Sequence, residues 1–300
     1  MAEQNNEEII RATVNKLSTD PNLDYLCPCV RGKGRFPSQQ AVKEIINLCR
    51  SLIFPGYFDN ATYSMDNLST HIGVDVGRLR LLLSKEIAGG FVVAEEPHDG
   101  LRARSLELAD RFIESLPTIR LMMNEDVEAI YRGDPAAVSP GEVICCYPAV
   151  RAIGNYRIAN RLHRLGVPVV PRMISEAAHR ETGIDIHPAA TIGHSFMIDH
   201  GTGVVVGETA IIGDNVKIYQ GVTLGAKSFP TDENDNAVKG LPRHPIIGDD
   251  VVIYANSTIL GRVTIGSGST IGGNIWVTDD VAPGSIIVQA RANNQVRQKR

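Results

Sequence analysis

Apolar side chains in the first 180 residues recur at the spacing of amphipathic helices. One face carries Val42, Ile45, Ile46, Cys49, Leu52 and Ile53, between a start signal at Pro37-Ser38 and a stop at Pro55-Gly56. Similar segments predict helices over 69–88, ending at Gly89-Gly90, and over 101–116, 118–132, 148–165 and 171–181, with one more in the first 25 residues. Residues 21–36, with two prolines and a Gly-Lys-Gly, predict an irregular connection.

From Ile186 onward the apolar period is six residues, which is the period of neither a helix nor a regular strand. The aliphatic positions are Ile186, Ile192, Ile198, Val206, Ile212, Ile218, Leu224, Ile247, Ile253, Ile259, Ile265, Ile271 and Val277. Glycine often follows them, where a chain turning a corner can use its freedom at positive φ. This hexapeptide pattern predicts a parallel β-helix, whereas a β-sandwich would alternate with period two.

Three hexads make one triangular coil, so the pattern predicts coils at 186–203, 206–223, 224–258 and 259–276, with a fifth beginning at 277. A polar interruption at about 227–246 should protrude from a corner of the third coil, and such loops often complete a site. The chain then divides into a helical domain over 1–182, a β-helix over 183–288 and a tail over 289–300.

Composition agrees with this division and reduces the classes of partner and the cellular locations to be considered. Leucine falls from 17 in the first 180 residues to 3 in the last 120, as expected where helices give way to β structure. The balance of 30 basic and 34 acidic residues argues against nucleic-acid binding. No apolar run is long enough for a membrane span, and the N-terminus does not resemble a secretory signal. Five cysteines without a disulfide or zinc spacing fit a reducing compartment, so we expect a cytoplasmic protein.

Titratable residues gather in one stretch of the predicted β-helix, at Asp185-Ile186-His187-Pro188 and Asp199-His200. Residue 185 lies one coil below residue 203, about 4.8 Å along the axis by strand spacing. Asp185 should therefore be close enough to orient the His200 imidazole and leave one ring nitrogen as a general base.

Other interpretations of these residues stay open. His200 could be a hydrogen-bonded turn histidine with no catalytic part. A zinc site could use His187, His200 and His244, although their spacing matches no zinc motif. A cysteine nucleophile from the β-helix is not expected, because all the cysteines lie at or before residue 146.

The run DIHPAATIGHSFMIDHGTGVVVGETAIIGDNVKIYQGVTLGA, followed by RHPIIGDDVVIYANSTILG, resembles the serine O-acetyltransferases of the hexapeptide acyltransferase superfamily. The similarity covers residues 183–276 and extends more weakly through Gly133-Asp134-Pro135-Ala136 and Tyr156-Arg157-Ile158. The resemblance implies left-handed coils and transfer of acetyl from acetyl-CoA to the L-serine hydroxyl in cysteine biosynthesis. Acetyl-CoA would be a co-substrate, with no metal or prosthetic group.

The resemblance also assigns roles by position. His200 matches the general base and Asp185 its orienting partner. The residues expected to grip serine are Asp199, Arg243, His244 and, in the helical domain, Asp134. The candidate CoA contacts are Gly225, Ala226 and Ala255. Cysteine, which resembles serine, is expected to inhibit.

The expected assembly is a homotrimer, or a dimer of trimers, with CoA in the groove between neighbouring β-helices. Many relatives carry a C-terminal isoleucine tail that enters O-acetylserine sulfhydrylase, whereas this chain ends IIVQARANNQVRQKR. We therefore expect no stable complex with that enzyme through such a tail. The alternatives are an acyltransferase acting on a sugar or another small hydroxyl compound, a non-enzymatic scaffold, and a β-helix metalloenzyme.

Overall fold

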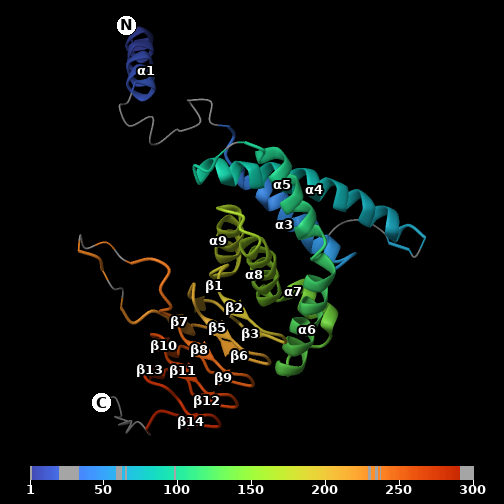
Figure 1. Cartoon of the computed structure of the whole chain (residues 1–300), viewed down its shortest axis with the longest axis vertical. Helices are drawn as coiled ribbons and strands as arrows, with labels where there is room; N and C mark the ends of the chain where they lie inside the picture. Colours follow the sequence, from blue (N-terminus) through green and yellow to red (C-terminus); the bar gives the residue numbers. More distant parts are fainter. Residues whose placement is uncertain are drawn as a thin grey trace, which may run out of the picture.

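Among the described residues, the helices all lie before Gly183 and the short parallel strands all lie after it (Figure 1). The computed structural model describes residues 2–19, 34–58, 63–64, 66–97, 99–228, 231–233, 236 and 238–290. Its helices are α1 (Ala2–Ser18), α3 (Gln39–Ile53), α4 (Leu68–Val93), α5 (Leu101–Ile113), α6 (Leu116–Gly133), α7 (Pro140–Cys146), α8 (Pro148–Arg164) and α9 (Val170–Thr182). All the helices predicted from the apolar pattern are present, while most of the predicted connection over 21–36 lies outside the described residues.

Helix α4 corrects one predicted boundary. The pattern was expected to end at Gly89-Gly90, but the helix continues to Val93. Both glycines are needed for close packing: a Cβ on Gly89 would lie 2.8 Å from the backbone nitrogen of Pro37, and one on Gly90 would lie 2.5 Å from the carbonyl oxygen of Pro168. Here the glycines allow the neighbouring backbone to approach closely, and they do not end the helix.

Helix α7 was not predicted. Its start nevertheless carries an N-cap, in which the Ser139 side chain accepts a hydrogen bond from the Glu142 backbone N–H at 3.1 Å. The Glu142 carboxylate in turn accepts from the backbone N–H of Val138 at 2.7 Å. The helix is only seven residues long, so its apolar positions are too few to show a period.

The strands form three parallel sheets that wind into a solenoid of about five turns. Sheet A contains β1 (Asp185–Ile186), β4 (Val205–Val206), β7 (Thr223–Gly225), β10 (Thr258–Leu260) and β13 (Trp276–Val277). Sheet B contains β2 (Thr191–Ile192), β5 (Ile211–Ile212), β8 (Ile246–Ile247) and β11 (Thr264–Ile265). Sheet C contains β3 (Met197–Asp199), β6 (Lys217–Tyr219), β9 (Val252–Ile253), β12 (Thr270–Ile271) and β14 (Ile286–Ile287).

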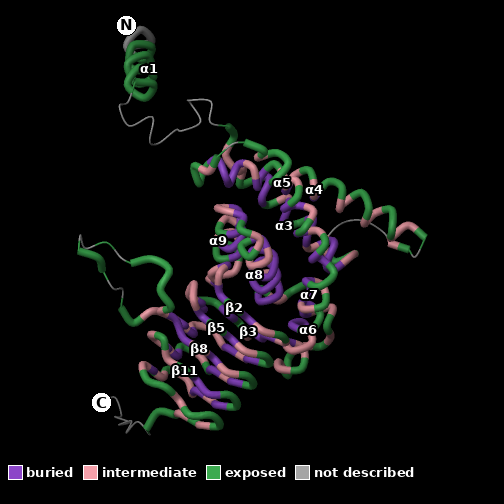
Figure 2. The backbone as a smooth tube through the Cα atoms, viewed as in Figure 1, coloured by how far each residue is buried: buried purple, intermediate pink, exposed green. Residues whose placement is uncertain are grey.

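The register confirms the predicted coils with one correction: Asp185 pairs with Val205 and not with Gly203, because the corner after β3 is two residues longer than the repeat. Ile186 pairs with Val206, Val206 with Leu224, Leu224 with Ile259, and Ile259 with Val277. All thirteen aliphatic positions of the six-residue period are buried, and they form the core seen along the solenoid in Figure 2. The hexapeptide period therefore predicted both the strand pairing and the direction of each core side chain.

The interruption of the third coil leaves the solenoid between β7 and β8 (Figure 1). Its described residues from Lys227 to Leu241 are exposed. Residues 291–300 lie outside the described residues, so the expectation about the C-terminal tail stays a prediction. No helix among the described residues has the length and apolar character needed to cross a bilayer.

Helix α8 closes the first coil of the solenoid by hydrogen bonds to its backbone. The Tyr156 hydroxyl donates to the carbonyl oxygen of Ala190 at 2.7 Å, and the Asn160 amide donates to the same oxygen at 2.9 Å. Carbonyl groups that would otherwise end the sheet are thereby satisfied, as buried backbone requires.

Arg157 on α8 makes the strongest of these contacts. Its guanidinium forms two hydrogen bonds to the buried carboxylate of Asp126 on α6, at 2.9 and 2.8 Å. It also donates to the carbonyl oxygens of Ile192 and Gly193 at 3.0 and 2.8 Å. Asp126 accepts from the backbone N–H of Phe196 at 2.9 Å, so the ion pair joins two helices to one corner of the first coil.

Replacing Arg157 should therefore destabilise the protein strongly. Arg157→Met leaves the buried Asp126 carboxylate without its counter-charge, and we expect a loss of about 3 to 5 kcal/mol in the free energy of unfolding. Urea unfolding followed by circular dichroism measures it. The matched control is Arg132→Met, because Arg132 is 76% exposed in its pair with Glu128 and should change stability by less than about 1 kcal/mol. Equal effects of the two substitutions would contradict the role given to the buried pair.

Candidate active site

His200 lies at a corner of the solenoid that is two residues longer than the repeat requires. Ile198 in β3 and Val206 in β4 are eight positions apart, whereas the core positions on either side of this corner are six apart. His200 and Gly201 both take left-handed backbone conformations, with φ of 54° and 86°. A Cβ on Gly201 would lie 2.5 Å from the Ile184 side chain, so glycine is required there. The His200 side chain is 76% exposed, as expected for a corner pushed outward.

Two carboxylates lie beside this imidazole. An Asp199 carboxylate oxygen is 4.0 Å from His200 Nε2. Asp134, which ends α6, accepts hydrogen bonds from the Tyr147 hydroxyl at 2.6 Å and from the Ala136 backbone N–H at 2.8 Å. These bonds, with a smaller contribution from His200, lower the pKa of the Asp134 carboxyl. We call Asp134, Tyr147, Asp199 and His200 the His200 corner.

Tyr147 keeps Asp134 in its charged form. Its hydrogen bond to that carboxylate, together with burial, raises the pKa of the Tyr147 hydroxyl to about 12. The hydroxyl is therefore a permanent donor at neutral pH. The His200 corner thus presents an imidazole between two anionic side chains, which suits a cationic part of a substrate.

A second group of side chains occupies the corner that follows sheet A, and we call it the Arg243 corner. It contains His187, Glu208, Thr209, Arg243 and His244. The Arg243 guanidinium donates to a carboxylate oxygen of Glu208 at 2.5 Å. Its Nε is buried and has no hydrogen-bond partner within the described chain, so the guanidinium still has an unused donor.

Thr209 holds the backbone of Arg243 and His244 in place. Its hydroxyl oxygen accepts from the backbone N–H of Arg243 at 2.9 Å and from that of His244 at 3.1 Å. A Cβ on Gly207 would lie 2.0 Å from the His244 ring, so only glycine leaves room for the imidazole. Residues 207–209 of the second coil thus determine where Arg243 and His244 lie.

His244 is held neutral and in one tautomer. The ring is 7% exposed, and its Nδ1 accepts from the backbone N–H of Thr209 at 3.0 Å. The proton must then be on Nε2, which is a donor. Burial, and after it the Arg243 charge, lower the pKa of His244 to about 4.

The charge of Asp185 acts on the Arg243 corner, at His187. Within the described chain it forms no ion pair or hydrogen bond with His200, whose acidic partner is Asp199. Instead its charge acts on His187. Burial and then the Arg172 charge lower the pKa of His187, and the negative charge of Asp185 opposes this lowering. Orientation of His200 by Asp185 therefore stays a prediction.

The predicted site residues thus divide between two corners of one chain. Asp134, Asp199 and His200 are at one corner, and Arg243 and His244 are at the other. The candidate CoA contacts divide in the same way: Gly225 ends β7 of sheet A and Ala226 follows it, whereas Ala255 follows β9 of sheet C. His187 and His244 share the Arg243 corner without His200, so the three histidines do not converge within the described chain, where no cluster suited to a metal ion is found.

Three contributing residues were not predicted. Glu208 and Thr209 follow the buried Val206 and Gly207, so they lie at a corner just after a core position, as Asp199 and His200 do after Ile198. That signal could have identified them. Tyr147 carries no local signal, because its contact with Asp134 depends on how α6 and α8 approach each other.

Comparison with known proteins gives the family. A model described as bacterial transferase hexapeptide (six repeats) matches residues 244–274. Over 292 residues the chain is 47% identical to the plasmid serine acetyltransferase of Synechococcus elongatus. The aligned region covers 94% of this chain and 90% of that protein. The chain belongs to the serine acetyltransferase family.

Solved structures agree with this family. Serine acetyltransferase isoform 3 of Entamoeba histolytica in complex with cysteine superposes with a TM-score of 0.73 and 34% identity, covering 85% of this chain and 84% of that one. A serine acetyltransferase in complex with CoA gives a TM-score of 0.53 and 25% identity, covering 84% and 98%. The predicted family, the β-helical fold and the acyltransferase class are therefore confirmed, while the roles of individual residues stay predictions.

The pKa of His244 predicts how stability depends on pH. Because the folded value is about 4 and the ordinary value is 6.5, the unfolded chain binds the proton first as pH falls. This contribution is complete above about pH 6.5 and is lost toward pH 4. His244→Gln, which cannot be protonated, should reduce the stability lost between pH 7 and pH 5 by about 2 kcal/mol. Urea unfolding at both pH values measures it.

The control is His179→Gln, because His179 is 46% exposed on α9. This variant should keep the pH dependence of the natural sequence. If His244→Gln behaves like the control, His244 is not held neutral by burial.

Proposed function

We propose that this chain transfers the acetyl group of acetyl-CoA to the hydroxyl oxygen of L-serine, giving O-acetylserine and CoA. The observation that carries the proposal is the 47% identity to a serine acetyltransferase across nearly the whole chain. The exposed His200 between Asp134 and Asp199 supports it, because a base beside two carboxylates suits an amino acid with a reactive hydroxyl.

In the proposed reaction His200 takes the proton of the serine hydroxyl. The oxygen then attacks the thioester carbon, and a new C–O bond forms as the carbonyl π electrons move to its oxygen. When the tetrahedral intermediate collapses, the C–S bond breaks and CoA leaves as a thiolate, which takes the proton from His200. A thiolate is a good leaving group because thiols ionise near pH 8.5, whereas the alcohol needs a base.

The charges of the two corners suit the two ends of serine. Asp134 and Asp199 would pair with its ammonium group. Arg243, whose side chain is partly exposed, would pair with its carboxylate, and the Nε2–H of His244 could donate to the same group. Glu208 would act as a positioning residue, since it holds the Arg243 guanidinium in place.

We propose that the complete site forms between copies of the chain. The base and the residues expected to bind the carboxylate follow different sheets of the triangular solenoid, and no ion pair or hydrogen bond joins the two groups within the described chain. A neighbouring copy could bring its Arg243 corner to the His200 corner. Cyclic symmetry would then repeat the same interface, as in the expected homotrimer. The candidate CoA contacts Gly225, Ala226 and Ala255 would border that groove.

An acyltransferase acting on another small hydroxyl compound is the alternative. Asp134 and Asp199 favour serine, because a neutral sugar offers no cation for two carboxylates. Release of CoA with serine, homoserine and simple sugars separates the two functions.

His200→Ala should lower kcat for serine acetylation by roughly 10² to 10⁴, because the hydroxyl loses its base. Release of CoA, followed by reaction of its thiol, measures the rate. In the same assay Asp185→Asn should act mainly on kcat if this residue orients the base, whereas Asp199→Asn should mainly raise the KM for serine. The control is Glu107→Gln on the exposed surface of α5. Near-normal activity of His200→Ala would contradict the mechanism.

Complementation tests the shared site. His200→Ala and Arg243→Gln chains, co-expressed with different tags, should regain roughly a quarter of full activity, because random mixing joins intact corners at one interface in four. Each variant alone should be nearly inactive. The control is a mixture of the separately purified variants, which contains no mixed assemblies until subunits exchange. Co-purified mixed assemblies without regained activity would show that both corners act within one chain.

A further inference from the structure

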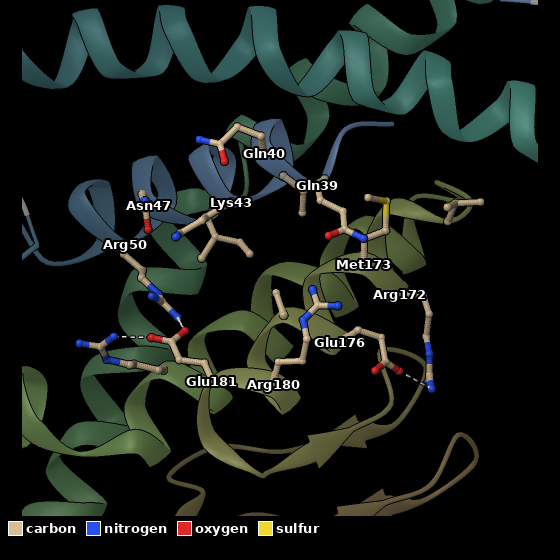
Figure 3. A pocket seen from close by; sticks show the side chains of 15 residues that line it. Gln39, Gln40, Lys43, Asn47, Arg50, Arg172, Met173, Glu176, Arg180 and Glu181 are labelled. Atoms are coloured by element: carbon tan, nitrogen blue, oxygen red, sulfur yellow. Dashed lines mark hydrogen bonds and ion pairs between the residues drawn. The ribbon is translucent and has the colours of Figure 1, made fainter. Parts of the chain in front are cut away.

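A cleft outside both corners lies between α3 and α9 (Figure 3), and Arg151 of α8 also lines it. Its volume is about 810 Å³, within the range of sites for small organic ligands. Apolar side chains from both helices line it, namely Val42, Ile46, Val169, Met173 and Ala177. None of the residues assigned to serine or CoA lines this cleft.

The cleft carries a surplus of positive charge. Its charged lining residues are Lys43, Arg50, Arg151, Arg172 and Arg180 against Glu176 and Glu181. Both carboxylates already have partners, since Glu181 pairs with Arg50 and Arg151, and Glu176 with Arg172. Lys43 and Arg180 form no ion pair within the described chain, and both extend into the space between the helices (Figure 3).

We propose that this cleft binds a small amphipathic anion, in which a carboxylate or phosphate head is joined to an apolar body. The head would lie between Lys43 and Arg180, where each side chain can form a charge-assisted hydrogen bond. The body would cover Val169, Met173 and Ala177, which are half-buried, and remove their exposed area from water. The ligand class follows from the joint presence of unpaired cations and an apolar floor.

Hexyl phosphate and hexanoate are suitable probes for titration calorimetry on the full chain. We expect at least one of them to bind with one site per chain, and the tighter of the two identifies the preferred head group. Inorganic phosphate and hexylamine should bind at least about tenfold more weakly, because each lacks one of the two features. Inorganic phosphate binding as tightly as hexyl phosphate would overturn the apolar part of the proposal. Failure of both probes to bind would overturn it entirely.

Variants locate the binding site. The double variant Lys43→Gln/Arg180→Gln should weaken binding by about tenfold or more, and Ala177→Trp should abolish it by filling the cleft. Arg111→Gln on α5 and Arg243→Gln at the other site should both bind as the natural sequence does, with folding of every variant checked by circular dichroism. Unchanged affinity in the double variant or in Ala177→Trp would overturn the proposal. Since binding is the readout, the result does not depend on serine acetylation.

Discussion

The buried ion pair between Arg157 and Asp126 is the contact on which the arrangement of helices and solenoid depends. A solenoid coil buries its faces only against other coils, so the first coil needs a cap. Arg157 donates to the carbonyl oxygens of Ile192 and Gly193, while Asp126 accepts from Phe196. One ion pair thus satisfies three backbone groups at the open end of the β-helix. Removing water from both charges costs free energy, which these added hydrogen bonds help to offset.

The same cap determines where the candidate chemistry can lie. Once α6 and α8 are fixed on the first coil, Asp134 at the end of α6 and Tyr147 at the start of α8 are brought beside His200. The extra length of the corner after β3 moves His200 outward from the solenoid, and its side chain is 76% exposed. The family's helical segment is therefore part of the His200 corner, in addition to its role in capping the β-helix.

The Arg243 corner depends on a different constraint, the stacking of successive coils. In the sequence His244 follows the long interruption of the third coil, yet its ring packs directly against Gly207 of the second coil. The buried ring stays neutral because ionisation in that position would cost solvation, and the Arg243 charge adds to this effect. A donor at Nε2 beside a guanidinium is a pair of groups suited to a carboxylate. Such a pair forms only because the solenoid places residues 35 positions apart in contact.

The amino-acid sequence by itself determined the solenoid, because a core with one aliphatic side chain per hexad produces a six-residue period in the sequence. It also indicated His200 and Arg243-His244 as chemically unusual positions. It could not show that Gly89 and Gly90 lie inside α4, because their role depends on the backbones of Pro37 and Pro168. Nor does a period reveal the hand of the coil. Tertiary structure alone decided that Tyr147 holds Asp134 and that Glu208 holds Arg243. Those contacts join residues from separate elements, and their distances follow from how helices and coils pack.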